Sequence, residues 1–214
     1  MRSFSDILFS LRSKLLRRYY NRGYGLIRLK KSINPSMSII SNNCLGGAIS
    51  NTLQYSYNSP TVGLYFMYPD FITFLEHLEG FILSKLEFKT QSLYENVNKE
   101  REDNPYPIGR LVYNGYEIEI EFLHYHSEEE AKEKWERRCS RIQMNNMIII
   151  GSEVDGCTNQ HVDRFMKLRY HKMLFLGRKK RHYDNPGYHY VKLLNSKRFK
   201  NLYSQAHFVY KYLC

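Results

Sequence analysis

The chain has 214 residues, 43% of them hydrophobic and 25% charged, which suits one soluble globular domain with its own core. The net charge of +11 is concentrated at the ends: residues 1–31 and residues 178–214 each hold nine basic residues and one acidic residue, whereas residues 32–177 hold 14 basic and 19 acidic residues. This distribution argues against a dedicated nucleic-acid-binding domain, whose basic residues would cover the folded body, and no apolar run approaches the roughly 20 residues that span a bilayer.

The N-terminal residues 1–34 are expected to form a basic amphipathic helix followed by a linker. Within residues 4–20, apolar side chains recur at steps of three and four, and arginine and lysine occupy the positions between them. Such a helix can lie peripherally on a membrane surface, attracted by anionic lipid, or it can pack against its own domain or a second copy of the chain.

Residues 35–177 are expected to form an α/β domain. Apolar runs predict strands over residues 37–41, 61–66, 147–150 and 172–176, and helical periodicity predicts helices over residues 47–53, 69–86, 127–141 and after residue 158. This alternation predicts a three-layer, mostly parallel sheet with helices on both faces and one antiparallel hairpin. Residues 178–214 are expected to form a basic, tyrosine-rich extension packed on this domain.

The dipeptide Asn114-Gly115 predicts a tight turn between hairpin strands over residues 110–113 and 116–123. In the second strand, glutamates alternate with apolar residues, so one face is expected to contact solvent and the strand to lie toward a sheet edge. These glutamates are Glu117, Glu119 and Glu121. Residues 87–107 are polar and proline-terminated, which predicts a surface insertion or a mobile loop.

The turn after the first strand is the leading candidate site, because ligands of α/β sheets bind beyond the carboxyl ends of the strands. Cys44 precedes a helix start, whose dipole favours a thiolate, and it is predicted to be a nucleophile or to position a donor. The amides of Gly46 and Gly47 and the side chains of Asn42 and Asn43 can bind an anion. The alternative is a small buried cysteine beside two turn asparagines.

His124 follows the second hairpin strand and is predicted to act as general base or acid with Cys44; alternatively, it is a structural histidine at a strand end. Its neighbour Tyr125 is assigned to the same anion-binding or substrate-binding set. Asp155 can orient His124, bind a sugar hydroxyl, or only stabilise its own turn.

Four basic residues share one face of the helix over residues 127–141, namely Lys134, Arg137, Arg138 and Arg141. They either form ion pairs with the glutamates of that helix or hold a phosphate group bidentately. Arg138 is predicted to be the substrate-binding member.

The four cysteines show no metal-ligand spacing, so no metal site is expected. No signal peptide is visible, which favours free thiols in a reducing cytoplasm. The expected location is therefore the cytoplasm, with peripheral contact to the inner face of the plasma membrane through residues 4–20 as one option.

Several stretches resemble bacterial exopolysaccharide-biosynthesis proteins. They are IISNNCLGG at 39–47, SPTVGL at 59–64, YPIG at 106–109, FLHY at 122–125 and EEAKEKWERR at 129–138, with Arg141 and Ile142 following. The similarity runs in order through roughly residues 37–176; Leu45 departs from it, because the family often has an aromatic residue there. The resemblance implies a role in surface-polysaccharide assembly but no defined reaction.

The combined expectation is a transferase that modifies a sugar unit or precursor during exopolysaccharide or capsule biosynthesis. The reaction would be an acyl or glycosyl-type group transfer, with a carbohydrate or phosphosugar as substrate. The donor would contain phosphate, such as a nucleotide sugar or coenzyme A; the turn at Cys44 is also similar to that of a capsule acyltransferase that binds coenzyme A. The alternative is a non-catalytic binding or scaffold protein of the same machinery.

Overall fold

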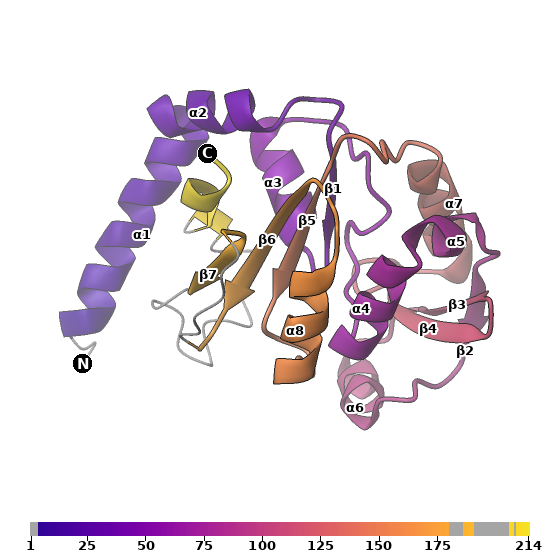
Figure 1. The fold of residues 1–214 in the computed structure, drawn as a ribbon. Helices are drawn as coiled ribbons and strands as arrows, with labels where there is room; N and C mark the ends of the chain where they lie inside the picture. The colour runs from indigo at the N-terminus through magenta and orange to yellow at the C-terminus, as the bar shows by residue number, and fades with distance from the viewer. Residues whose placement is uncertain (1–3, 180–185, 191–205, 208) are drawn as a thin grey trace.

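The computed structural model describes residues 4–179, 186–190, 206–207 and 209–214 and has a mixed α/β fold with two sheets (Figure 1). The strands of parallel sheet A are, in spatial order, β1 (Ser38–Ser41), β5 (Met147–Ser152), β6 (Lys172–Gly177) and β7 (Tyr188–Tyr190). The strands of antiparallel sheet B are, in spatial order, β2 (Glu87–Lys89), β3 (Ile108–Tyr113) and β4 (Tyr116–Glu121). The predicted α/β class with mostly parallel strands is confirmed.

The described helices lie on both faces of sheet A and around sheet B (Figure 1). They are α1 (Phe4–Arg22), α2 (Tyr24–Ser32), α3 (Leu45–Leu53), α4 (Tyr68–Glu76), α5 (Leu78–Leu83), α6 (Glu95–Asp103), α7 (Glu128–Cys139), α8 (Asn159–Lys167) and the short 3₁₀ helix η2 (Tyr210–Tyr212). Within the described residues, no helix combines the length and the hydrophobicity needed to cross a bilayer.

Sheet A separates two hydrophobic cores, and its strands β1 and β5 are buried at every position. Successive side chains of a strand point to opposite faces, so Ile39 and Ile148 enter one core while Ile40 and Ile149 enter the other. Continuous apolar runs of this kind are typical of parallel strands covered on both faces.

One core joins sheet A to α1, α2, α3 and four residues near the C-terminus, which are Ala206, Val209, Tyr210 and Leu213. The other core joins sheet A to α4, α5, α7, α8 and sheet B. The C-terminal extension predicted over residues 178–214 is therefore seen only in part, since residues 180–185, 191–205 and 208 lie outside the described residues.

The predicted hairpin is confirmed, although it belongs to a separate sheet with β2 as a third strand. Asn114 and Gly115 both have positive φ, 47° and 81°, which a two-residue hairpin turn of this twist requires. β4 lies at the edge of sheet B, as expected, and an isolated bridge joins its last residue to Tyr65.

The predicted strand over residues 61–66 is wrong. These residues belong to a segment, residues 61–67, that passes from sheet A to sheet B; we call it the connecting segment. Its amide at Phe66 donates to the carbonyl of Asn42 near sheet A, and its residue Tyr65 exchanges two backbone hydrogen bonds with Glu121 of sheet B. A segment that divides its hydrogen bonds between two sheets forms no continuous ladder, despite its apolar composition.

Of the two alternatives predicted for residues 87–107, the mobile loop is wrong, because these residues contain β2 and α6. Val97 and Tyr106 from this region are buried together with Tyr65 and Met67 in a third, smaller hydrophobic cluster. The region covers the face of β4 that carries the glutamates. The expectation that this face contacts solvent therefore fails for Glu119 and Glu121, which are 0% exposed, and holds only for Glu117.

Candidate functional site

The turn at residues 42–47 is at the carboxyl end of β1, as predicted, and its polar groups bond to one another and to β5. The Asn42 side chain is buried; its Oδ1 accepts from the Ser152 amide at 3.0 Å and from the Ser152 hydroxyl at 2.9 Å. The Asn43 Nδ2 donates to the same hydroxyl at 2.8 Å. Both asparagines therefore join β1 to β5.

Of the Gly46 and Gly47 amides at the start of α3, which were expected to bind an anion, that of Gly46 already has an acceptor, as does the neighbouring Leu45 amide. The Gly46 amide donates to Ser41 Oγ and the Leu45 amide donates to Asn43 Oδ1, each at 3.0 Å. A Cβ on Gly46 would lie 3.0 Å from the Ile39 carbonyl oxygen, and one on Gly47 would lie 3.1 Å from a methyl group of Val62. These glycines allow α3 to pack closely against its neighbours.

Cys44 carries a neutral thiol in this environment. The Sγ atom lies 3.8 Å from the Leu64 carbonyl oxygen, in the geometry of a weak hydrogen bond. Burial raises the thiol pKa to about 11, and the negative charge of Asp155 raises it further. The expected thiolate is not favoured, because desolvation outweighs any effect of the helix dipole.

His124 and Cys44 both flank residues 63–64, yet the described residues show no hydrogen bond between their side chains. The His124 amide donates to the Gly63 carbonyl at 3.0 Å, and the side chain is exposed. The catalytic pairing expected for these two residues thus has no hydrogen bond to support it.

Tyr125 and Arg138 hold the connecting segment in place. The Tyr125 hydroxyl donates to the Val62 carbonyl oxygen, and Arg138 Nη1 donates to the same oxygen at 2.9 Å and to the Tyr125 hydroxyl. The Arg138 guanidinium also lies over the Tyr57 ring, 5.2 Å from its centroid. Both side chains are buried, and their hydrogen bonds to the Val62 carbonyl stabilise the packing of α7 against the connecting segment.

Asp155 occupies a turn beyond β5 with a positive φ of 53°. Its carbonyl accepts from the Tyr68 amide at 2.7 Å, which attaches the start of α4 to the carboxyl edge of sheet A. Its carboxylate raises the pKa of both Cys44 and Glu121. Asp155 therefore acts electrostatically on the turn of β1 and on the end of β4.

A cluster of three carboxyl groups lies beside the connecting segment, formed by Asp70 of α4 and by Glu119 and Glu121 of β4; we call it the carboxyl cluster. Glu119 has a complete set of partners. Its carboxylate pairs with Lys89 and accepts from the Ser92 hydroxyl at 2.6 Å and from the Leu93 amide at 3.1 and 3.2 Å. This residue is a satisfied buried anion.

Glu121 differs, because neither of its carboxyl oxygens has a hydrogen-bond partner although the side chain is fully buried. Burial raises its pKa well above the usual value, and Asp70 and Glu119 raise it further. Burial therefore favours the neutral, protonated form of this carboxyl group. A buried polar group without a partner is destabilising, and such groups are rare in folded proteins unless a ligand or water satisfies them.

Asp70, in the first turn of α4, is the half-buried member of the cluster. Its Oδ2 atom has no hydrogen-bond partner, whereas the carboxyl group accepts a hydrogen bond from the Tyr94 side chain. Burial raises the Asp70 pKa to about 7, against the hydrogen bond from Tyr94, which lowers it. A carboxyl group that is partly protonated near neutral pH can both accept and release a proton.

Two tyrosines and a further glutamate adjoin the carboxyl cluster. The hydroxyl groups of Tyr65 and Tyr106 lie 2.8 Å apart, and both donate to Glu100 Oε2, at 2.7 and 3.0 Å. Burial raises the pKa of both tyrosines, which favours the protonated hydroxyl; each can donate one hydrogen bond, and one of the two accepts from the other. Among the described residues, no three His, Cys, Asp or Glu side chains are arranged to hold a metal ion.

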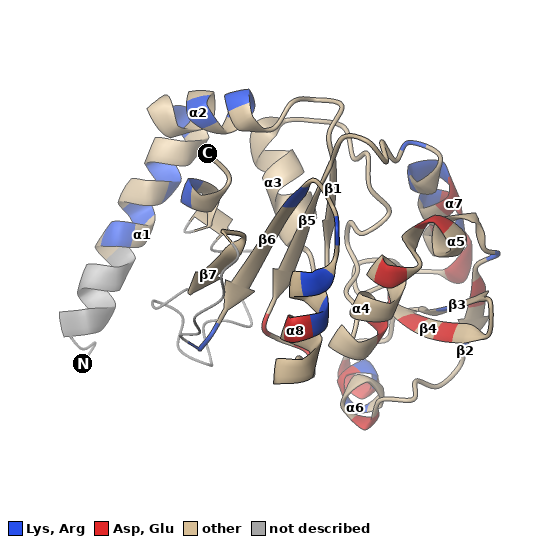
Figure 2. Ribbon diagram, viewed as in Figure 1, with Lys and Arg blue, Asp and Glu red and all other residues tan. Residues whose placement is uncertain are grey.

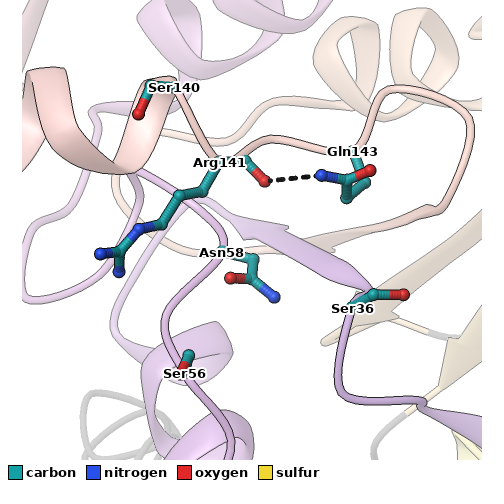
Figure 3. A pocket seen from close by; sticks show the side chains of 6 residues that line it. All are labelled: Ser36, Ser56, Asn58, Ser140, Arg141 and Gln143. Atoms are coloured by element: carbon teal, nitrogen blue, oxygen red, sulfur yellow. Dashed lines mark hydrogen bonds between the residues drawn. The ribbon is translucent and has the colours of Figure 1, made fainter.

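A separate open pocket of about 510 Å³ lies at the opposite edge of sheet A, where β1 and β5 begin (Figure 3). It is lined by Ser36, Ser56, Asn58, Ser140, Arg141 and Gln143.

Of the four basic residues predicted to share a face of α7, Lys134 and Arg137 pair with Glu130 and Glu133. Arg141 reaches the pocket, while Arg138 is buried.

The carboxyl cluster was missed by sequence reasoning because its glutamates alternate with apolar residues, which is also the pattern of a solvent-facing strand. A usable signal was present in the neighbouring segment. Lys89, Ser92 and Tyr94 are suitable partners for buried carboxyl groups, and they follow one another within six residues.

Comparison with known proteins shows one matching family model and one similar protein. Residues 16–213 match the family model described as "Domain of unknown function (DUF1919)". A protein of Haemophilus influenzae with the description "Uncharacterized protein" is 35% identical over 147 residues, which are 68% of this chain. The matched part spans 64% of the length of that relative.

Proposed function

The chain belongs to the DUF1919 family, whose description assigns no activity, and from its own residues we propose that it is a group-transfer enzyme in which Asp70, supported by Glu121, exchanges a proton with the substrate. The observation that carries this proposal is the fully buried Glu121 carboxyl group without a partner, next to a half-buried Asp70 that also has an unpartnered oxygen. The pKa of Asp70, about 7, suits general acid–base work at neutral pH.

The proposed step is transfer of a group from an activated, phosphate-containing donor to a sugar hydroxyl. The hydroxyl proton passes to the Asp70 carboxylate while the hydroxyl oxygen bonds to the electrophilic carbon of the donor. The leaving group departs with the electron pair of the broken bond, and Asp70 then releases its proton to that group or to solvent. Glu121, as a neutral acid, can donate a hydrogen bond to a substrate oxygen.

The substrate class rests on the resemblance to exopolysaccharide-biosynthesis proteins. We therefore propose a sugar unit or precursor of a surface polysaccharide as acceptor and a nucleotide sugar or an acyl-coenzyme A as donor. Cys44 and His124 have no chemical role in this scheme, because the thiol is neutral and the described residues show no hydrogen bond between the two side chains.

A scaffold role in the same machinery is the second candidate. It is favoured by one observation: the amides of Leu45 and Gly46 at the start of α3 are occupied by side chains of the same turn, which leaves them no capacity for an anion. A scaffold would bind carbohydrate or protein partners without consuming a donor.

The test is an assay of donor consumption with purified full-length protein. Nucleotide sugars and acyl-coenzyme A thioesters are incubated with sugar-phosphate acceptors, and release of nucleoside diphosphate or free coenzyme A is measured. We expect Asp70→Asn to lower turnover at least 100-fold and Cys44→Ala to leave it within threefold. Turnover that survives Asp70→Asn would refute the acid–base role, and absence of donor consumption across the panel would favour the scaffold.

A further inference from the structure

The helices α1 and α2 carry an unusual share of the exposed apolar surface. Ten large apolar or aromatic side chains are exposed in the described residues, and half of them lie on these two helices. They are Leu11, Leu15, Tyr19, Tyr24 and Ile27, with exposures of 53%, 69%, 37%, 65% and 53%. Isolated exposed leucines are ordinary, but a concentration on neighbouring helices indicates an interaction surface.

Four of these side chains, Leu11, Leu15, Tyr24 and Ile27, project away from the body of the protein, whereas the Tyr19 ring packs edge-on against Tyr20 with 4.9 Å between the ring centroids. The packed side of α1 is formed by Ser13, Leu16 and Tyr20; Tyr20 is buried against Tyr210, with ring centroids 5.3 Å apart, and the Ser13 hydroxyl bonds to His207 at 2.9 Å. With 100° between successive residues, Leu11 and Leu15 lie on the opposite side of the helix. In α2, Leu29 is buried, while Tyr24 and Ile27 project outward.

Basic residues accompany the apolar ones on the same outward sides. Helical spacing places Arg18 and Arg22 beside the exposed leucines of α1, and Arg28 and Lys31 beside Tyr24 and Ile27 of α2; all four are exposed. We call these four residues and the five exposed apolar ones the α1–α2 face. The sequence contains no aspartate or glutamate from residue 7 to residue 69, so carboxylates of this stretch cannot neutralise the face.

The charge is also segregated across the molecule. Figure 2 shows the basic residues along α1 and α2 on one side, and most of the acidic residues around sheet B, α6 and α7 on the other. Residues 70–139 hold 16 acidic and nine basic residues. One side of the protein is therefore attracted to an anionic surface while the other side is repelled by it.

We propose that the α1–α2 face docks on an anionic phospholipid surface, with the leucines and aromatic rings entering the headgroup region and the arginines and lysines contacting the lipid phosphates. Exposed apolar groups combined with basic neighbours on a helix fit this partner. A second copy of the chain fits less well, because a symmetric contact through the same face would bring like charges together. Nucleic acid would satisfy the charges but leave the leucines in water.

The docking is independent of the proposed group transfer, since no residue of the α1–α2 face belongs to the carboxyl cluster. It would hold the protein at a membrane surface. Docking on a membrane also explains why α1 packs on the protein through one side and leaves apolar side chains exposed on the other.

The experiment is co-sedimentation of the full-length protein with vesicles of phosphatidylcholine that contain 30% phosphatidylglycerol, at 100 mM NaCl. Vesicles of pure phosphatidylcholine provide the neutral comparison. We expect binding at least tenfold stronger to the anionic vesicles, and a steep decrease as salt is raised. Equal binding to both vesicle types, or none to the anionic ones, would overturn the proposal.

Matched variants separate the two contributions. Leu11→Ser with Leu15→Ser should weaken binding to anionic vesicles at least fivefold, and Arg18→Glu with Arg22→Glu at least tenfold. The controls are Leu83→Ser with Leu93→Ser, which are 85% and 75% exposed elsewhere, and Lys85→Glu with Lys99→Glu, which make the same change in charge. Controls should stay within twofold, and circular dichroism verifies that each variant is folded.

The oligomeric state distinguishes the remaining partner. Sedimentation velocity of the wild-type protein and the Leu11→Ser/Leu15→Ser variant is measured at several concentrations without lipid. A monomer in both cases agrees with the proposal. A dimer that the leucine substitutions dissociate would overturn it, because the face would then be covered by a second copy.

Discussion

Glu119 and Glu121 project from the same face of β4 and are equally buried, yet they have different surroundings. Glu119 meets Lys89, Ser92 and a backbone amide, whereas the Glu121 carboxyl oxygens meet no donor. A buried anion requires compensation by a cation or several hydrogen bonds, and without them the group becomes protonated. The chemistry of each carboxyl group is therefore set by its neighbours in space.

The raised pKa values of the carboxyl cluster predict how the free energy of unfolding depends on pH. Asp70 and Glu121 have raised native pKa values, so the native state retains protons that the unfolded chain loses above about pH 4. The free energy of unfolding therefore falls as pH rises from about 4 through 7, and Asp70 alone can account for a decrease on the order of 4 kcal/mol. Glu121→Gln, which keeps a neutral side chain, should reduce this dependence and stabilise the protein at pH 8 by about 1–3 kcal/mol.

Urea unfolding at pH 5, 6.5 and 8 measures this effect. Glu119→Gln is the control: it removes the charge that pairs with Lys89 and should lower stability by about 3 kcal/mol. It should flatten the pH dependence less than Glu121→Gln does, because burial, and not the charge of Glu119, is the largest cause of the raised pKa values. If Glu121→Gln shows the same pH dependence as the wild-type protein, Glu121 is ionised in the native state. It could then not donate a hydrogen bond to a substrate oxygen, which would contradict its proposed role.

At the scale of elements, β4 is positioned by the turn that precedes it and by the segment that crosses its end. Asn114 and Gly115 close the hairpin, and six residue pairs set the register of β3 and β4 so that Ile118 and Ile120 enter the core. At the other end of β4, Glu121 exchanges two backbone hydrogen bonds with Tyr65. The carboxyl cluster thus depends on a local turn and on a contact between residues 56 positions apart.

The turn gives a prediction for the stability of sheet B. Gly115 has φ of 81°, and a Cβ at this position would meet no other atom within 4 Å, so Gly115→Ala introduces backbone strain without a steric clash. We expect a loss of about 1 kcal/mol in the free energy of unfolding, as for other L-residues forced to positive φ. Urea unfolding measures it, and Asn114→Gly is the control, which should be close to neutral. No loss for Gly115→Ala would show that the turn adopts another conformation.

At the scale of the molecule, the two hydrophobic cores on either side of sheet A stabilise different parts of the protein. The core toward sheet B supports the carboxyl cluster, and the core on the other side anchors α1 and α2 (Figure 1). Tyr20 is the main anchor of α1, since it is 6% exposed and packs edge-on against Tyr210, whose hydroxyl bonds to Thr52 at 2.7 Å. The outward side of the same helix remains free to meet a partner.

The anchor predicts local rather than global destabilisation. Tyr20→Ala removes a buried aromatic ring from the contact between α1 and the body, so α1 should detach while sheet A and sheet B stay folded. Trypsin should then cleave after Arg18 and Arg22 at least fivefold faster than in the wild-type protein, with cleavage sites mapped by mass spectrometry. Tyr24→Ala, at an exposed position of α2, is the control and should not change the rate. Unchanged cleavage in Tyr20→Ala would show that other contacts hold the helix.

Features that depend on short-range patterns could be predicted from the residues alone. The apolar runs of β1, β5 and β6, the hairpin at Asn114-Gly115 and the amphipathic helix at the N-terminus were all predicted, because periodicity and turn chemistry are local properties. Sequence reasoning also recognised that Asn42 and Cys44 follow the first strand, where they are found.

The chemistry of those residues depends on segments that meet only in the folded chain. Residues 87–107 fold over β4 and turn an apparent solvent face into a buried carboxyl cluster, and burial leaves Cys44 with a pKa of about 11 where the helix start suggested a thiolate. Both outcomes depend on desolvation by segments distant in the chain. Ionisation and hydrogen bonding respond to everything within a few ångströms in space, and no local pattern of residues records which segments will come that close.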